Sequence, residues 1–317
     1  MPFFRQDTDL TVLGDRILQA TLAQFPGLAR NQIALTWVVY DPGFPMNTGG
    51  AIAATDFWRH PSRGYSYRGV ECLYPASIVK LFYAVALQEW VSKDMLEMTP
   101  EVERAARDMI VASSNDATGL IVDLLTGTTS GPELPPGPFE TWKQQRNLVN
   151  RYFQALGWEE LESCNINQKT WGDGPYGRER SFYGENYTNR NRLTTEAVAR
   201  LVHSIAGGVA VSAAASQQLL GWMARTLDPA DWKPDPENQI GGFIGEGLPA
   251  GAKCWSKAGW MSRVRHDAAY VELPGGLPYT VVVFVEGEEH ADNEKLIPFV
   301  SSWVAQSVQE MTVQETS

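Results

Sequence analysis

The sequence predicts an α/β (α+β) protein, in which an antiparallel sheet is flanked by N- and C-terminal helices and interrupted by an inserted all-helical domain. Three observations support this class. The 317 residues, 44% of them apolar, suffice for about two typical domains. β-rich segments lie near the two ends of the chain, and the segments between them have helical periodicity. We therefore expect residues 1–70 and 208–317 to form an α/β sandwich domain and residues 71–207 a helical domain.

The N-terminal part contains one helix and one strand signal. Apolar residues recur at helical spacing from Leu10 to Leu22, and Pro26 with Gly27 ends the predicted helix. The short β-rich run from residue 33 to 40 is followed by Asp-Pro-Gly, which predicts a strand and a turn. Both elements belong to the expected sandwich domain.

The middle of the chain has the pattern of several helices. The run Ser77–Trp90 is apolar at most positions, which predicts a central, buried helix. Thr99 followed by Pro100 has the features of an N-cap and a first helical position. Further helices are expected up to Ile110, over Asp116–Leu125 and over Phe139–Leu156, with a Pro- and Gly-rich loop over Gly127–Pro138.

The run from residue 164 to 192 is rich in Asn, Gly and Arg and has no period of either kind. Because a loop of this length inside a compact protein usually has a function, we expect a functional omega-type loop here. The remaining elements expected are helices over Thr195–Ala206, Ser216–Leu227 and Asn293–Met311, and a hairpin of Ala268–Leu273 with Tyr279–Val285 around Pro274-Gly275-Gly276.

The charge balance is acidic. The chain has 26 Lys and Arg against 37 Asp and Glu, a formal net charge of -11. Such a surface repels polyanions, so we expect no nucleic-acid partner. A locally basic stretch, interpreted as loop charges, contains Arg178, Arg180, Arg190 and Arg192.

Cysteine and histidine usage predicts neither a metal site nor a cofactor. Cys72, Cys164 and Cys254 are an odd number without CxxC spacing, and we expect idle or buried thiols. The four histidines are scattered without metal-ligand spacing.

The first residues, MPFFRQDTDL, lack the basic and apolar regions of a secretion signal, and no window of 18 uncharged apolar residues follows. As written, the chain is expected to be cytoplasmic, without a membrane span. It would be periplasmic or extracellular if the true N-terminus is missing. The sequence leaves the oligomeric state open.

The strongest local motif is an SxxK element at the start of the apolar helix, with Ser77 and Lys80 on one helix face. Burial of the lysine would lower its pKa and allow it to accept the serine proton. In a chain with this Ser and Lys content, about 0.5 SxxK patterns are expected by chance. The element therefore gains its weight from the two that follow.

An SxN element, Ser113 to Asn115, lies between two predicted helices; it offers a hydroxyl and an amide, although a helix cap would have the same composition. A KxG element, Lys257 to Gly259, precedes the C-terminal strands. A glycine on a strand lets another backbone approach closely.

SxxK, SxN and KxG in this order resemble the signature set of the penicillin-recognising serine hydrolases, the class A β-lactamases and penicillin-binding proteins. The segments LLGWMARTLDP, GGFIGEGLPAGAKCWSKAGW and RHDAAYVEL resemble class A enzymes as well. The resemblance covers most of the chain. It implies a helical domain inserted into an α/β sandwich, in agreement with the element order.

The resemblance also implies a role for each motif residue. Ser77 would be the acylated nucleophile, with Lys80 as its general base. The remaining roles are Ser113 and Lys257 for proton transfer or carboxylate binding, Asn115 and Gly259 for substrate contact, Trp260 for a backbone N–H of the oxyanion hole, and Arg265, or else Arg263, for the carboxylate.

Three features depart from the class A pattern. The gap from Ser77 to Ser113 is shorter than in typical class A enzymes, which predicts a helical domain that is trimmed there and enlarged later. Ala258 replaces the hydroxyl residue of the KxG element, which removes one donor, a loss of about 1 kcal/mol. The ExxLN element, whose glutamate activates the deacylating water, is missing. Glu185 is our preferred substitute, with Glu179 as the other candidate, although either glutamate could simply pair with arginines.

The function expected is therefore a serine hydrolase that cleaves an amide, in a β-lactam or a small peptidoglycan-like substrate, through an acyl-enzyme on Ser77. The alternatives are a DD-peptidase, an esterase or glutaminase-like hydrolase, and a receptor that binds β-lactams without turnover. The missing ExxLN element favours the last of these.

Overall fold

The computed structural model describes residues 2–50 and 52–315 and divides the chain into two compact units. The sheet unit consists of Met1–Glu71 and Thr195–Ser317, and the helical unit of Cys72–Thr194. The segment from residue 195 to 207 thus belongs to the sheet unit, whereas the sequence pattern predicts it as part of the helical domain.

The sheet unit contains a seven-stranded sheet in the order β1-β3-β2-β7-β6-β5-β4. All neighbours are antiparallel except β1 and β3. The strands are β1 (Phe4–Gln6), β2 (Ile33–Val39), β3 (Ser62–Tyr67), β4 (Ala224–Arg225), β5 (Lys253–Met261), β6 (Val264–Glu272) and β7 (Tyr279–Glu286). The fold class expected from the sequence is confirmed, but β1, β3 and β4 have no clear sequence signal.

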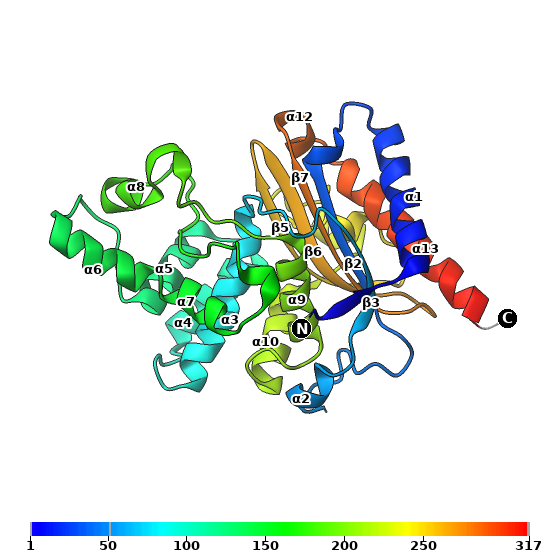
Figure 1. Cartoon of the computed structure of the whole chain (residues 1–317), viewed down its shortest axis with the longest axis horizontal. Helices are drawn as coiled ribbons and strands as arrows, with labels where there is room; N and C mark the ends of the chain where they lie inside the picture. Colours follow the sequence, from blue (N-terminus) through cyan, green and yellow to red (C-terminus); the bar gives the residue numbers. More distant parts are fainter. Residues whose placement is uncertain (1, 51, 316–317) are drawn as a thin grey trace. The chain divides into compact units, whose positions relative to one another are not determined.

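Helices cover both faces of this sheet (Figure 1). Helices α1 (Thr8–Gln24) and α13 (Leu296–Glu315) pack together on one face, over the alternating apolar residues of β2 and β7. Helix α9 (Thr195–Ala206) packs on β2, β6 and β7. Because β2 is covered on both faces, all of its residues are buried.

Helix α9 belongs to the sheet unit because it covers the second face of the sheet. The Thr195 hydroxyl lies 2.7 Å from that of Thr36 on β2, and the His203 ring lies against Tyr40. Nearly all of its residues are buried, so sequence periodicity gave no indication of which domain it joins. The other helices of this unit are α2 (Ala54–Phe57), α10 (Ala213–Met223), α11 (Pro229–Trp232), α12 (Glu288–Ala291) and the 3-10 turns η1 (Arg30–Gln32) and η5 (Ile244–Gly247).

The helical unit is built around α3 (Val79–Ser92), which is buried on nearly all sides, as its apolar composition predicts. Thr99 caps α4 (Pro100–Val111) by accepting a hydrogen bond from the N–H of Val102, which confirms the predicted start. The single helix predicted over 139–156 is two helices that meet at Asn147. The remaining elements are η2 (Ala76–Ile78), α5 (Asn115–Thr126), α6 (Pro136–Arg146), α7 (Leu148–Ala155), η3 (Glu159–Leu161), α8 (Gly177–Tyr183) and η4 (Glu185–Tyr187).

Side-chain amides hold the two limbs of the polar run 164–192 together. Asn165 and Arg192 form a β-bridge, and the Asn165 amide donates to the carbonyls of Asn189 and Arg190. The side-chain Oδ1 of Asn191 accepts from the backbone N–H groups of residues 167 and 168, at 2.9 Å each. The abundance of Asn therefore reflects hydrogen bonds that replace a regular ladder.

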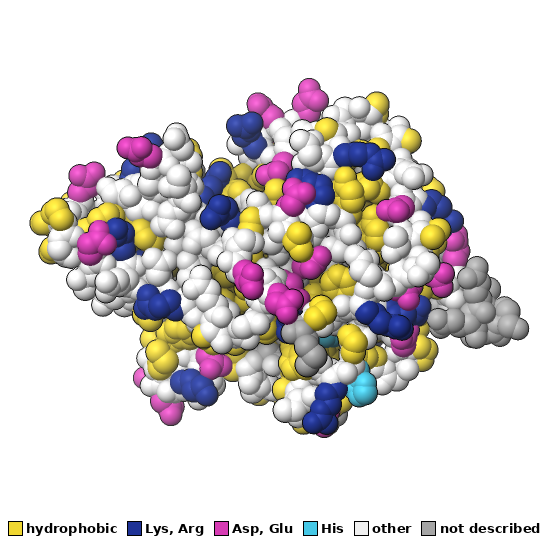
Figure 2. All heavy atoms as spheres, viewed as in Figure 1, with side chains coloured by type: hydrophobic (Ala, Val, Ile, Leu, Met, Phe, Trp, Pro, Cys, Tyr) yellow, Lys and Arg dark blue, Asp and Glu magenta, His cyan; other side chains and the backbone are white. Residues whose placement is uncertain are grey.

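Charges on the molecular surface are mixed in sign. On the face shown in Figure 2, basic side chains are scattered among acidic ones. Part of the basic stretch is used internally, since the Arg190 guanidinium lies 3.3 Å from the Tyr74 ring centre and Arg178 donates to the Pro132 carbonyl. In the described part of the chain, no helix combines the length and the apolarity needed to cross a membrane.

Candidate active site

Ser77 lies in η2, directly before α3, and is half-buried. The residue before it, Ala76, has φ of +46°, a left-handed conformation that is unfavourable for an L-residue with a side chain. Such strain is kept only where the surrounding structure imposes it, and it is frequent at active sites. The helix that follows places Lys80 one turn further along the same face.

Lys80 is fully buried although it carries an amine. Its Nζ lies 2.5 Å from the Ser113 carbonyl oxygen, 2.9 Å from Asn115 Oδ1 and 3.2 Å from Ser113 Oγ. Burial lowers the pKa of Lys80 to about 7. Two of the three predicted motifs, SxxK and SxN, thus meet at one amine within the helical unit.

The middle residue of the SxN element caps the next helix. Ser114 Oγ accepts the N–H of Ala117 and so forms the N-cap of α5. This cap leaves Ser113 and Asn115 to contact Lys80. Ser113 has φ of +54°, the second strained residue at the site. Within this motif, Ser114 is the helix cap, and Ser113 and Asn115 are the residues that contact Lys80.

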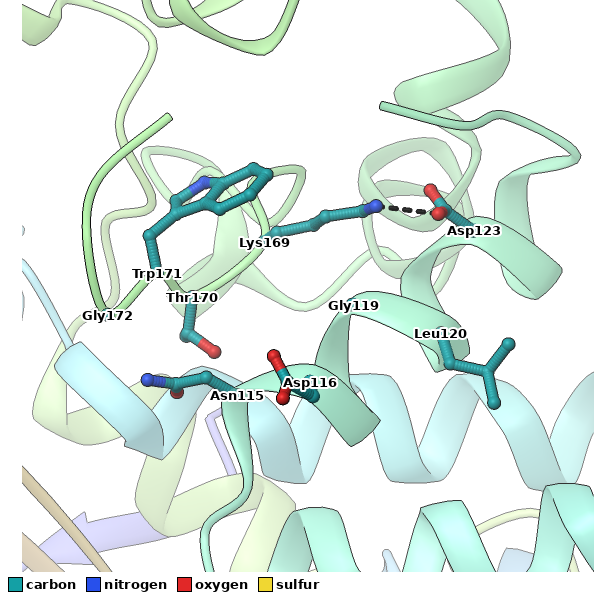
Figure 3. Close-up of a pocket in the computed structure, with 9 residues that line it drawn as sticks. All are labelled: Asn115, Asp116, Gly119, Leu120, Asp123, Lys169, Thr170, Trp171 and Gly172. Atoms are coloured by element: carbon teal, nitrogen blue, oxygen red, sulfur yellow. Dashed lines mark hydrogen bonds and ion pairs between the residues drawn. The ribbon is translucent and has the colours of Figure 1, made fainter. Parts of the chain in front are cut away.

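A pocket of about 280 Å³ lies beside Asn115. Figure 3 shows α5 on one side and the start of the polar run on the other, with an ion pair between Lys169 and Asp123. Two acidic residues line it, Asp116 and Asp123, and neither was singled out from the sequence. The lining residues are Asn115, Asp116, Gly119, Leu120, Asp123 and Lys169–Gly172.

Glu179 belongs to a buried ion-pair cluster next to this pocket. Its Oε1 accepts from Arg146 Nη2 at 2.6 Å and from Ser130 Oγ at 2.7 Å. Arg146 also contacts Asp123, and Lys169 Nζ lies 2.6 Å from Asp123 and 3.9 Å from Glu179. Arg146 and Glu179 are fully buried. Glu179 thus pairs with an arginine, Arg146. This is one of the two alternatives that the sequence leaves open for Glu179.

Glu185, the preferred carboxylate, begins η4 and is exposed. Among the described residues its carboxylate has no hydrogen bond or ion pair. The next residue, Asn186, has φ of +53°, which produces a kink after it. The structure brings neither Glu179 nor Glu185 into the group of side chains around Lys80.

In the sheet unit, Lys257 lies on β5 and is fully buried. Its Nζ donates to Gln239 Oε1 at 2.6 Å and to the Ala258 carbonyl at 2.7 Å. The same Gln239 oxygen accepts the N–H of Ala258 at 3.1 Å. Gln239 therefore fixes the first two residues of the KxG element, and no sequence pattern pointed to it.

Strand β4 pairs only with Cys254 and Trp255, so the rest of β5 has β6 as its single ladder neighbour among the described residues. Gly259 lies in this stretch and is buried, whereas the Trp260 side chain is 53% exposed. The Trp260 indole donates to the Ala291 carbonyl at 2.9 Å. In this stretch the Ala258 N–H and carbonyl are occupied by Gln239 and Lys257, and the Ser256 carbonyl by Arg225. An added extended chain would have to replace these side-chain contacts.

Arg265 and Lys257 lie on opposite faces of the β5–β6 ladder. Directly opposite residues share a face, and the pairs are Trp260 with Arg265 and Lys257 with Ala268. The Arg265 guanidinium stacks over Phe243, donates to the Ala291 carbonyl at 2.8 Å and is nearly buried. Arg263, the alternative, lies in the exposed turn before β6. Arg265 is thus largely engaged by its own neighbours.

Two further charged side chains, one buried and one half-buried, lie near Lys257. Asp267 is fully buried, and its carboxylate accepts the N–H groups of Ile244 and Ala268. Burial raises the pKa of Asp267 to about 6, against these hydrogen bonds and the charges of Arg225 and Lys257. Arg225 donates to the Ser256 carbonyl at 2.7 Å, so it anchors β4 to the middle of β5.

No three His, Cys, Asp or Glu side chains in the described ranges are close enough together to hold a metal ion.

The fold and the group of hydroxyl, amide and amine around Lys80 define a class, the penicillin-recognising serine hydrolases. A sequence model described as the β-lactamase enzyme family matches residues 97–308, more than half of the chain. The chain therefore belongs to the β-lactamase enzyme family. No curated protein sequence matches it.

Solved structures with a similar fold include PBP-A, with 20% identity and a TM-score of 0.62, over 98% of this chain and 99% of that chain. A β-lactamase from Sphaerobacter thermophilus has 18% identity and a TM-score of 0.63, over 93% and 97%. The TLA-1 extended-spectrum β-lactamase has 14% identity and a TM-score of 0.64, over 92% and 98%. At these identities the likeness concerns the fold.

Proposed function

We propose that the protein is an acyl-transfer hydrolase in which Ser77 attacks the carbonyl of a β-lactam or of a small peptide-like amide. The observation that supports this most directly is the buried Lys80 amine, held by Ser113 and Asn115 one helical turn from Ser77. A buried amine with a pKa of about 7 is half neutral at neutral pH, as a general base requires.

The three contacts of Lys80 suit a proton relay. A neutral amine has two N–H donors and one lone pair. The donors match the two groups that can only accept, the Ser113 carbonyl and Asn115 Oδ1. The lone pair then faces Ser113 Oγ, whose hydroxyl can donate to it. Ser113 would carry the proton between Lys80 and the leaving group of the substrate.

In the sheet unit, the stretch of β5 that contains Lys257 and Gly259 would bind the substrate as an added strand. Gln239 holds Lys257 and the backbone at Ala258, the position where related motifs have a hydroxyl. The Lys257 ammonium would attract the substrate carboxylate.

Deacylation is expected to be slow, because the two candidate glutamates and the pocket residue Asp123 are ion-paired or exposed. Glu179 is paired with Arg146, Asp123 with Lys169, and Glu185 is exposed. This pairing favours a long-lived acyl-enzyme, and with it penicillin binding or a DD-peptidase over rapid β-lactam hydrolysis.

The test is labelling with a fluorescent penicillin and intact-protein mass spectrometry, together with hydrolysis of a chromogenic cephalosporin. Wild type should gain one covalent adduct and show a burst followed by a slow steady state. Ser77→Ala should gain none, whereas Ser181→Ala, an exposed serine on α8, should behave as wild type.

Equal labelling of wild type and Ser77→Ala would exclude covalent catalysis at Ser77. Rapid steady-state hydrolysis would instead show that a water-activating group is present, and Glu185→Gln would then identify or dismiss that carboxylate. Release of ammonia from glutamine by wild type, lost in Ser77→Ala, would assign the glutaminase-like alternative.

A further inference from the structure

Two of the three cysteines, Cys72 and Cys164, lie near each other in the helical unit. Cys72 Sγ contacts both the carbonyl oxygen and the hydroxyl of Ser163, each at 3.1 Å. Ser163 directly precedes Cys164, so the Cys72 sulfur contacts the residue next to the second cysteine. Residues almost a hundred positions apart in sequence thus form one dithiol site, which the cysteine spacing did not reveal.

The residue that follows each of the two cysteines forms a β-bridge. Leu73 forms a β-bridge with Leu193, and Asn165 forms one with Arg192. The residue after each cysteine therefore pairs with the same short stretch. Cys164 is further held by a contact of its Sγ with the Glu160 carbonyl at 3.4 Å. The thiols meet because regular pairing places their neighbours, and no movement of a distant segment is needed to bring them together.

The two thiols differ in their surroundings. Cys72 is half-buried, and hydrogen bonds from Cys164 and Ser163, with the positive charge of Arg192, lower the pKa of its thiol. Partial burial acts to raise the pKa of Cys72, but the hydrogen bonds and the charge of Arg192 have the larger effect. Cys164 is buried, and its contact with Cys72 raises the pKa of its thiol. The pair thus has a more reactive, accessible partner and a protected one.

We propose that Cys72 and Cys164 form a site of reversible oxidation, in which Cys72 reacts with a hydroperoxide and Cys164 resolves the product to an intramolecular disulfide. In the first step the Cys72 thiolate attacks the O–O bond, and the sulfenic acid and an alcohol or water are formed. In the second, the Cys164 sulfur displaces the hydroxyl as water, and its thiol proton leaves with it. The hydroperoxide is the oxidant, and it is reduced.

The disulfide would join the first residue of the helical unit to the start of the polar run. It would close a loop of about 90 residues and so lower the entropy of the unfolded chain. It would also hold the segment from Asn165 to Lys169, which leads into the wall of the pocket beside Asn115. The assignment does not depend on the chemistry of Ser77.

The test uses the full-length protein, first reduced and then treated with hydrogen peroxide near neutral pH. Two of the three thiols should disappear from a denaturing thiol assay, and non-reducing peptide mapping should find Cys72 linked to Cys164. Dithiothreitol should restore both thiols. Cys254→Ser is the matched control: its cysteine is buried on β5 in the sheet unit, so the cross-link should form in equal yield.

Two variants separate the roles of the pair. Cys164→Ser should accumulate a sulfenic acid on Cys72 that dimedone traps, without a cross-link. Cys72→Ser should lose thiols at least about tenfold more slowly than wild type. In the cross-linked wild type, the melting temperature should rise by several degrees, reversibly on reduction.

Peroxide treatment that consumes thiols in folded wild type without a Cys72–Cys164 peptide would overturn the assignment. Equal rates of thiol loss in wild type and Cys72→Ser would do so as well. Because none of these measurements uses a β-lactam, they remain decisive even if Ser77 is not acylated.

Discussion

Lys80 acquires the properties of a base from its position in the fold. Its spacing from Ser77 follows from the helix, but its pKa follows from complete burial within α3 and its neighbours. Three oxygen contacts then orient the amine. Gln239 is a comparable case in the sheet unit, since it fixes Lys257 through one side-chain oxygen without belonging to any motif.

The rate of Ser77 acylation should therefore depend on pH through Lys80. With a pKa lowered to about 7, the amine is neutral above that pH and protonated below it. The rate should be on a plateau above pH 7 and fall about tenfold for each further pH unit below it. Measurement of fluorescent-penicillin labelling between about pH 5 and pH 9 checks this.

Lys80→Arg provides the comparison, because a guanidinium remains charged over the whole range. Its labelling should be slow and nearly independent of pH. A wild-type rate that rises as the pH falls would contradict the role of Lys80 as proton acceptor.

At the scale of elements, the polar run 164–192 and helix α6 are joined by buried charge. Arg146 on α6 is fully buried between Asp123 and Glu179 and lies 4.6 Å from the centre of the Trp142 ring. Removing one member of such a group leaves a charge buried without its partner, which costs more than the group contributes as a whole.

Arg146→Met should accordingly lower the free energy of unfolding by about 3–5 kcal/mol, because the buried Glu179 carboxylate would lose its closest ionic partner. Denaturant unfolding followed by circular dichroism measures the change. Lys143→Met, on the same helix in a surface pair with Glu140, should change stability by no more than about 0.5 kcal/mol.

The double variant Arg146→Met, Glu179→Leu distinguishes this explanation from a simple loss of packing. It should recover part of the lost stability, since apolar groups of similar size can replace a buried ion pair. A double variant less stable than the single one would show that Glu179 contributes independently of Arg146.

At the scale of the whole molecule, the net charge of -11 opposes an anionic substrate. Under the proposed function, a penicillin carboxylate would have to cross this field to reach Lys257. Salt shortens the range of the field, from a Debye length of about 30 Å at 0.01 M to about 8 Å at 0.15 M.

The second-order rate of acylation by an anionic penicillin should therefore rise by about twofold between these salt concentrations. A neutral ester substrate serves as the control, and its rate should be unchanged. Stopped-flow measurement of labelling tests this. A fall in rate with salt would mean that the basic groups near the site dominate over the net charge.

Much of the fold was predictable, because apolar periodicity and caps are local properties. Helices α1, α3 and α4, the hairpin β6–β7 and the class of architecture follow from them. Strand β1 has three residues at the edge of the sheet, and β3 lies between it and β2, so their pairing depends on residues distant in sequence. Helix α9 belongs to the sheet unit because it covers one face of the sheet. Its own sequence, buried at nearly every position, does not indicate this.

The sequence by itself determined the order of SxxK, SxN and KxG, and with it the family and the residues expected to act. Only the tertiary structure decided that Ser113 and Asn115 meet Lys80 and that Glu179 pairs with Arg146. It also decided that Cys72 contacts Ser163, the residue before Cys164. The physical reason is that motif order and periodicity are properties of neighbouring residues. Burial, ion pairing and thiol contact depend on segments that only folding brings together.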